Sequence, residues 1–188
     1  TGDWDVLWDA CQETDTTVSH YIGTQAQRRS ISPRRALEVS MSLNSQNAQG
    51  SLCDWVFSRT LERFPGIKLA YAESQVGWMP FLLERMDGVW HEGVGSVELA
   101  QPPSSYVKDR VFGCIFDDLH GLRSRDEVGM DQILFEVDYP HANGTWPHST
   151  DVVRSMVHAA GLDATETRKL VRSNAIACYG LGRFGITD

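Results

Sequence analysis

The sequence predicts an α/β protein built from parallel β/α units. Four short apolar runs typical of strands alternate with longer stretches of helical pattern, and this alternation favours a parallel sheet. The last two runs, 111–116 and 133–137, are nearly continuously apolar, as expected for strands that are covered on both faces. With 188 residues, of which 41% are hydrophobic, the chain is predicted to form a single domain over 1–188.

The elements of the first third follow from local signals. A helix is expected over 5–13, and the first strand over 17–22. The next helix begins at Pro33, since proline suits the first turn of a helix. A third helix is expected over 52–63, and the Pro65-Gly66 pair ends it.

Strand and helix signals continue to alternate along the rest of the chain. The last helix has Asp163 in front of it and Glu166 three residues later, the pattern of a capping box. The remaining strands are expected at 67–72, 111–116 and 133–137, and the remaining helices at 79–89, 104–108, 152–160 and 166–179. We expect the four strands to be adjacent, parallel and in chain order, with the helices on one face.

Composition excludes several classes of protein. Acidic residues outnumber basic ones by 25 to 17, a formal charge of −8, and a nucleic-acid or anionic-membrane binder needs a basic surface instead. No apolar run approaches the ~18 residues of a membrane span, and no signal-peptide pattern opens the sequence. The four cysteines form no C-x-x-C pair, which predicts free thiols in a cytoplasmic protein.

The number of units leaves two architectures open. A closed (β/α)₈ barrel takes about 250 residues, whereas this chain offers four strands in 188 residues. It is either a small open α/β domain or the second half of a barrel.

Polar and ionisable side chains follow each predicted strand at its carboxyl end. Active sites of parallel α/β proteins form at this edge, and a histidine with carboxylates suits Zn²⁺, Mn²⁺ or Fe²⁺. Structural roles stay open: Glu73 is placed to pair with Arg85, and Asp138 to cap the next helix. The residues at the strand ends are His20, Glu73, Asp117, Asp118, Asp138 and His141, and His148 lies in the loop that follows.

Three blocks of sequence are distinctive. They are the run 69–87, the block Asp138-Tyr139-Pro140-His141 and the block 145–149. The first of them contains Glu73 and, after it, Gly77-Trp78-Met79-Pro80. On these blocks the chain resembles the amidohydrolase-related family of metal-dependent TIM-barrel enzymes, which includes the aminocarboxymuconate-semialdehyde and resorcylate type decarboxylases. The likeness extends from Asp5 to Gly180.

The resemblance assigns roles to particular positions. It implies that His20 is the metal-binding histidine of the family's fifth strand, and that Asp138 is the strand-eight metal ligand and a base. Glu73 stands where many members have a catalytic histidine, and His141 lines the site. The family's His-x-His or Asp-x-His element on strand one is missing, so the resemblance implies that the chain corresponds to the C-terminal half of a (β/α)₈ TIM barrel, strands five to eight. We therefore expect the N-terminal half of the barrel, a second chain or self-association to cover the exposed interior.

The resemblance also implies the function. We expect a metal-dependent hydrolase of the amidohydrolase superfamily that acts on a small carbonyl or carboxylate compound, with Asp138 and Glu73 as catalytic residues. His20, Asp138 and Glu73 would hold a divalent metal ion, zinc first, with manganese or iron as alternatives. The residues expected to contact substrate are His141, His148 and Arg85. The rival interpretations are a non-oxidative decarboxylase on the same site and a non-catalytic half-barrel subunit or fragment.

Overall fold

A four-stranded parallel sheet organises the chain in the computed structural model, which describes residues 2–21, 36–96, 98–142 and 144–187. The strands are β1 (Val18–Tyr21), β2 (Leu69–Ala72), β3 (Val111–Ile115) and β4 (Ile133–Phe135). They are hydrogen-bonded in the order β1-β2-β3-β4, and each neighbouring pair is parallel. The predicted sheet order is confirmed, while Ile22 of the first predicted strand lies outside the described residues.

Helices connect the strands, and most lie where the sequence pattern predicts them. The helices are α1 (Asp5–Glu13), α2 (Ala36–Ser42), α3 (Gln46–Phe57), α4 (Thr60–Arg63), α5 (Met79–His91), α6 (Leu119–Arg123), α7 (Arg125–Val128), α8 (Ser149–Ala160), α9 (Ala164–Arg168) and α10 (Asn174–Tyr179). Shorter helical turns are η1 (Gly2–Trp4), η4 (Pro103–Tyr106), η5 (Met130–Gln132), the π-helical turn η6 (Lys169–Ser173) and η7 (Leu181–Phe184).

The structure divides one predicted helix into two and confirms the start signal of another. The helix predicted over 52–63 is two helices, because Arg59 between α3 and α4 adopts the left-handed conformation with φ of 63°. The predicted start at Pro33 lies outside the described residues. The capping box is confirmed: the Asp163 carboxylate accepts the Glu166 N–H at 2.8 Å, and Glu166 accepts the Asp163 N–H at 3.0 Å.

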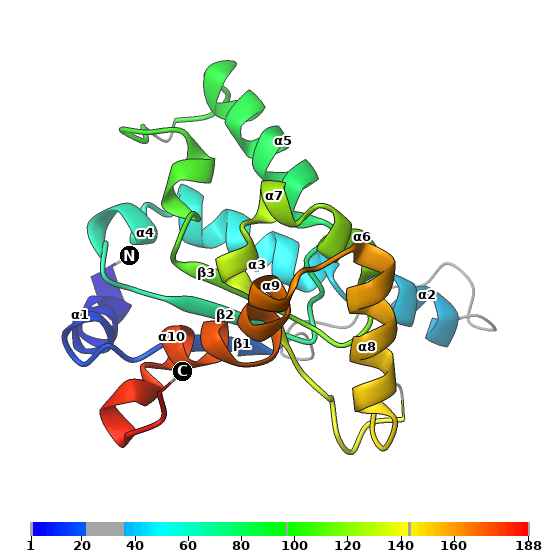
Figure 1. Ribbon diagram of the computed structural model, residues 1–188. Helices are drawn as coiled ribbons and strands as arrows, with labels where there is room; N and C mark the ends of the chain where they lie inside the picture. The colour runs from blue at the N-terminus through cyan, green and yellow to red at the C-terminus, as the bar shows by residue number, and fades with distance from the viewer. Residues whose placement is uncertain (1, 22–35, 97, 143, 188) are drawn as a thin grey trace.

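The main hydrophobic core lies between one face of the sheet and the helices that follow the strands. Figure 1 shows α3 and α5 on this side of the strands. The fully buried side chains in this layer include Leu52, Leu69, Ile115, Leu122 and Ile133. Burying apolar side chains of this size contributes about 1.5–3 kcal/mol each.

The opposite face of the sheet is covered in part by α10 (Figure 1). There Phe112, Cys114 and Leu134 form a second cluster with Cys178 of α10. The expectation that helices cover one face only is therefore corrected. The physical reason is that the final helix is anchored beneath the sheet: Asn174 donates to the carbonyls of Met130 and Ile133, both at 2.7 Å.

Side-chain alternation along β1 decides which residues face which layer. Val18 and His20 point to the main core, where the His20 ring stacks on Tyr71 with centroids 4.9 Å apart. His20 Nε2 accepts the indole N–H of Trp55 on α3 at 2.8 Å. Since successive residues of a strand point to opposite faces, Tyr21 is on the other face of the sheet.

The cysteines of the chain are free, as predicted. Three are buried, at Cys11, Cys114 and Cys178, and Cys53 is partly buried. Among the described residues no helix has the length and apolar character needed to cross a membrane.

The anchoring of α10 gives a stability prediction. Replacing Asn174 by alanine removes two hydrogen bonds and leaves two carbonyls near the start of β4 without this donor, so we expect Asn174→Ala to lower the free energy of unfolding by about 2–4 kcal/mol. Chemical denaturation measures it. The matched control is Thr167→Ala on α9. The exposed Thr167 hydroxyl donates to the Asp163 carbonyl of its own turn, and its loss should lower the free energy of unfolding by less than about 0.5 kcal/mol. Equal effects of the two substitutions would contradict the anchoring role.

The half-buried position of His20 gives a pH prediction. Burial lowers the pKa of His20 below its ordinary value, so between that lowered pKa and about 6.5 the unfolded chain binds a proton that the folded chain does not. Stability should therefore fall as the pH drops below about 6.5, by up to about 1.4 kcal/mol per pH unit. Unfolding of the wild type and of His20→Gln, measured at pH 7.5 and 5.5, separates this effect from the other histidines. A wild type that loses no more stability than the variant on acidification would refute it.

Candidate functional site

Three ionisable side chains meet at the carboxyl edge of the sheet. Glu73 directly follows β2, and Asp138 and His141 lie in the loop after β4. Each of the three offers a ligand atom, and these atoms all lie within 4.8 Å of one another. His141 Nδ1 is 2.6 Å from Asp138 Oδ1 and 3.7 Å from Glu73 Oε1. The structure thus brings together two of the predicted metal ligands and one predicted substrate-binding residue.

Both carboxylates sit on unusual backbone. Glu73 has φ of 58° and Asp138 has φ of 54°, and Gln75 also has φ of 58°. Left-handed backbone costs an L-residue about 1–2 kcal/mol, so the surrounding contacts must hold these residues in place. The His141 N–H closes the turn after Asp138 by donating to the Asp138 carbonyl at 2.9 Å. The chain passes close to the same oxygen at Gly144, where a Cβ would lie only 2.6 Å from it.

The segment 73–78, here named the Glu73 loop, folds back against the end of β3. The Asp118 carboxylate accepts the N–H groups of Val76 at 2.7 Å and Gly77 at 2.8 Å, and it also caps α6 through Gly121. Asp118 is therefore the N-cap residue of α6. Space for the loop depends on Gly113, where a Cβ would lie 2.3 Å from Val76 Cγ1.

Glu136 is a component of the site that the sequence reasoning missed. Its Oε1 accepts the backbone N–H of Glu73 at 2.6 Å, although Glu136 follows β4 and Glu73 follows β2. The available signal was a charged residue inside the nearly continuous apolar run 133–137. A glutamate in a strand covered on both faces needs a hydrogen-bond partner.

Negative charge is concentrated at this edge. Burial, together with repulsion from Asp138, raises the pKa of Glu73. Burial also raises the pKa of Glu136 to about 7, with smaller contributions from the charges of Glu73 and Asp138. The hydrogen bond to Asp138 raises the pKa of His141 and favours its protonated form.

The buried side chain of Asp138 is incompletely satisfied by the described residues. It is 2% exposed, and its Oδ2 has no hydrogen-bond partner among them. A buried carboxylate oxygen without a partner is costly. A divalent cation held by Glu73, Asp138 and His141 fits this donor set, because carboxylate oxygens and an imidazole nitrogen are ordinary ligands of such ions.

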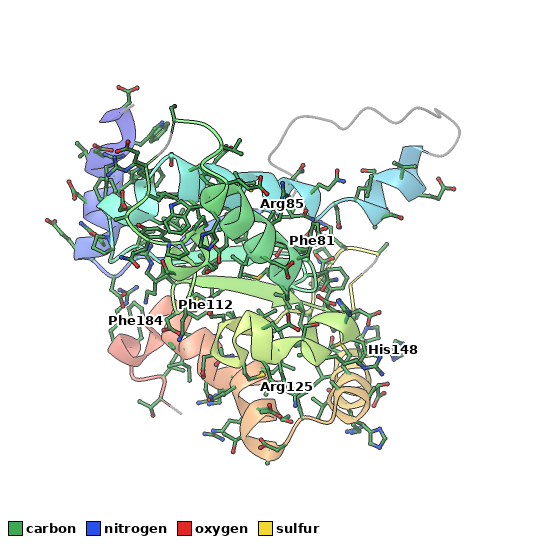
Figure 2. All side chains as sticks on the ribbon, turned by 90° about the horizontal axis from the view of Figure 1, so that it is seen from above. Phe81, Arg85, Phe112, Arg125, His148 and Phe184 are labelled. Atoms are coloured by element: carbon green, nitrogen blue, oxygen red, sulfur yellow. The ribbon has the colours of Figure 1, made fainter. Side chains whose placement is uncertain are left out.

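Three predicted site residues lie away from this group. The His20 ring is on the helix-covered face with Trp55, so the structure does not bring it together with Glu73 and Asp138. The physical reason is the parity of β1, which turns His20 toward α3. The Arg85 side chain is exposed on α5 and lies 3.8 Å from Glu92, so the pairing considered with Glu73 is not found. His148 is exposed just before α8. Figure 2 shows the side chains of Arg85 on α5 and His148 before α8 on separate elements.

Tyr21 faces the site in place of His20. It pairs in register with Ala72, the residue before Glu73, and its side chain is on the face opposite to the main core. The charge of Glu73, followed by burial and the charge of Asp138, raises the pKa of the Tyr21 phenol. A neutral phenol that stays protonated is a hydrogen-bond donor for an anionic oxygen.

Solved structures with the same fold are about twice as long as this chain. An amidohydrolase from Mycobacterium avium subsp. paratuberculosis K-10 matches with a TM-score of 0.68 and 18% identity, over 94% of this chain and 45% of that one. A dihydroxybenzoic acid decarboxylase from Polaromonas sp. JS666, solved with manganese and the inhibitor 2-nitroresorcinol, matches with a TM-score of 0.70 and 16% identity, over 97% of this chain and 55% of that one. A 5-carboxyvanillate decarboxylase from Sphingomonas paucimobilis matches with a TM-score of 0.64 and 16% identity, over 93% and 52%.

These likenesses establish the fold. The chain spans about half the length of the solved structures that it matches, and its four parallel β/α units are the C-terminal half of a (β/α)₈ TIM barrel. No curated protein matches the chain. A family model described as amidohydrolase matches residues 1–181, nearly the whole sequence. The chain therefore belongs to the amidohydrolase family.

Proposed function

We propose that the chain carries the C-terminal half of the active site of a metal-dependent enzyme that acts on a small carbonyl or carboxylate compound. The observation that supports this most directly is the group of Glu73, Asp138 and His141 around a buried Asp138 oxygen that lacks a partner among the described residues. Family membership supports the same assignment.

The donor set supports a hard or borderline divalent ion. Two carboxylates and one imidazole suit manganese, iron or zinc, and the excess of oxygen donors favours manganese. The Polaromonas decarboxylase of the same fold was solved with manganese bound. When bound, such an ion would lower the pKa of a bound water and polarise a carbonyl oxygen.

The protein's own residues have separate tasks in this proposal. Glu73, Asp138 and His141 would hold the ion, and Asp138 is also placed to take a proton during hydrolysis. His141 bonds one oxygen of Asp138 at 2.6 Å and fixes the orientation of that carboxylate. Tyr21 faces the same edge and is placed to donate a hydrogen bond to an oxygen of the substrate.

Two reaction classes compete for this site. Hydrolysis is the first, because a carboxylate base next to a metal site is suited to activating water. Non-oxidative decarboxylation is the second, and the solved structures named as decarboxylases, which match over 93–97% of this chain, favour it. A non-catalytic half-barrel is the remaining alternative.

The open edges of the sheet support a requirement for a further half-barrel. In the part of the chain that the structure describes, β1 and β4 are the edge strands, and each pairs on one side only. Unpaired edges of a parallel sheet are templates for further strands. We propose that four more β/α units, an N-terminal half or a second chain, complete the barrel and the site.

Metal binding tests the proposed donor set. We expect the chain to bind Mn²⁺ in calorimetric titrations, and Asp138→Asn to weaken binding at least about 100-fold because it removes a ligand charge. His141→Gln should weaken binding about tenfold. His20→Gln is the matched control and should change affinity less than about threefold, since its ring lies on the other face of the sheet. Unchanged affinity in Asp138→Asn, or lost binding in a folded His20→Gln protein, would count against the assignment.

Turnover tests the requirement for a second half. The chain is assayed alone and with a separately expressed N-terminal half of a family member, on esters, lactones and carboxylated aromatics. We expect turnover only in the combined sample, reduced about 10²–10⁴-fold by Asp138→Asn. Acid release would identify a hydrolase, and release of carbon dioxide a decarboxylase. Equal turnover by the chain alone would refute the requirement for a second half-barrel.

A further inference from the structure

We infer that Glu136 is a positioning residue that holds Glu73 in the conformation the proposed site requires. The inference rests on the proposed function only for its consequence, which is metal affinity. Its structural part, the bond between the Glu136 carboxylate and the Glu73 backbone, stands independently of any ion.

The contact crosses a whole strand. Strand β3 lies between β2 and β4, and the Glu136 N–H donates to the carbonyl of Ile115 on β3 at 2.9 Å. From this anchored backbone the Glu136 side chain passes over β3 and accepts the Glu73 N–H at 2.6 Å. The ends of β2, β3 and β4 are thereby tied to one another at the edge where the site lies.

The bonded N–H belongs to a residue that needs support. Glu73 has φ of 58°, a left-handed conformation that residues other than glycine rarely adopt. Its side chain points to Asp138 and His141 only while this backbone is maintained. The hydrogen bond to Glu136 fixes the first residue of the Glu73 loop, and Asp118 fixes Val76 and Gly77 at its other end.

The geometry distinguishes positioning from ligation. One Glu136 oxygen is bonded to the backbone N–H, and Glu136 is not among the three described residues whose ligand atoms converge. Outer partners that orient metal ligands commonly change metal affinity without touching the ion. Glu136 therefore acts on the ion through Glu73.

Two substitutions separate the acceptor from the charge. Glu136→Gln keeps an acceptor oxygen on a side chain of the same length and removes the charge. Glu136→Leu keeps the approximate size and removes the acceptor. Glu127→Gln and Glu127→Leu, at an exposed site on α7, are the matched controls. If Glu136→Leu does not fold, as judged by circular dichroism, Glu136→Ala takes its place.

The first readout needs no metal. Hydrogen exchange of the Glu73 amide, followed by NMR in the full chain, should be at least about tenfold faster in Glu136→Leu, and near wild type in Glu136→Gln. The second readout is Mn²⁺ affinity, which should fall about 10–100-fold in Glu136→Leu and change less than about threefold in Glu136→Gln.

Each outcome bears on the inference. Rescue by glutamine in both readouts supports positioning. Unchanged exchange in Glu136→Leu, or a glutamine variant as impaired as the leucine variant, would overturn it, the latter because charge would then matter and not the acceptor. If the wild type binds no Mn²⁺, the metal proposal fails, and the amide exchange still decides whether Glu136 positions Glu73.

Discussion

The candidate site depends on the folding of the Glu73 loop across the end of β3. Two carboxylates from later strands hold it: Glu136 accepts the first N–H of the loop, and Asp118 accepts two more near its end. Val76 can lie against β3 only because Gly113 has no Cβ there. These contacts compensate the left-handed backbone of Glu73 and direct its carboxylate toward Asp138. Hydrogen bonds made by one set of acidic residues thus position another.

The same arrangement concentrates negative charge at one edge of the sheet. The carboxyl ends of parallel strands meet there, so acidic residues separated by about sixty positions in the sequence become neighbours. Desolvation and mutual repulsion raise the pKa values of Glu73 and Glu136, and His141 offsets part of the charge. Structural carboxylates normally bond to cations or N–H groups, whereas the buried Oδ2 of Asp138 has no such partner among the described residues. Charge repulsion and an unsatisfied oxygen together distinguish this edge from an ordinary network of ion pairs.

The two faces of the sheet differ in how they are closed. The helices that follow the strands pack on one face and form the main core, in which His20 is part of the β1–α3 contact. On the other face α10 covers the cluster around Phe112 and Cys114, anchored by Asn174 at the start of β4. In the described chain Tyr21 remains 44% exposed on this face. The interior of a half-barrel is thus closed near the amino ends of its strands and accessible near their carboxyl ends, where the candidate site lies.

Sequence alone determined the features that depend on local pattern and chain order. These are the four parallel strands in sequence, the Asp163 capping box, and the placement of Glu73 and Asp138 at one edge, because parallel strands align their carboxyl ends. Tertiary structure decided which face of the sheet a side chain occupies and which distant residues it contacts. A one-residue change of parity would exchange the faces of His20 and Tyr21, and the contacts of His20 with Tyr71 of β2 and Trp55 of α3 fix it. The reach of Glu136 across β3 and the distance of Arg85 from Glu73 likewise depend on how the strands and α5 are placed in space, which no local pattern encodes.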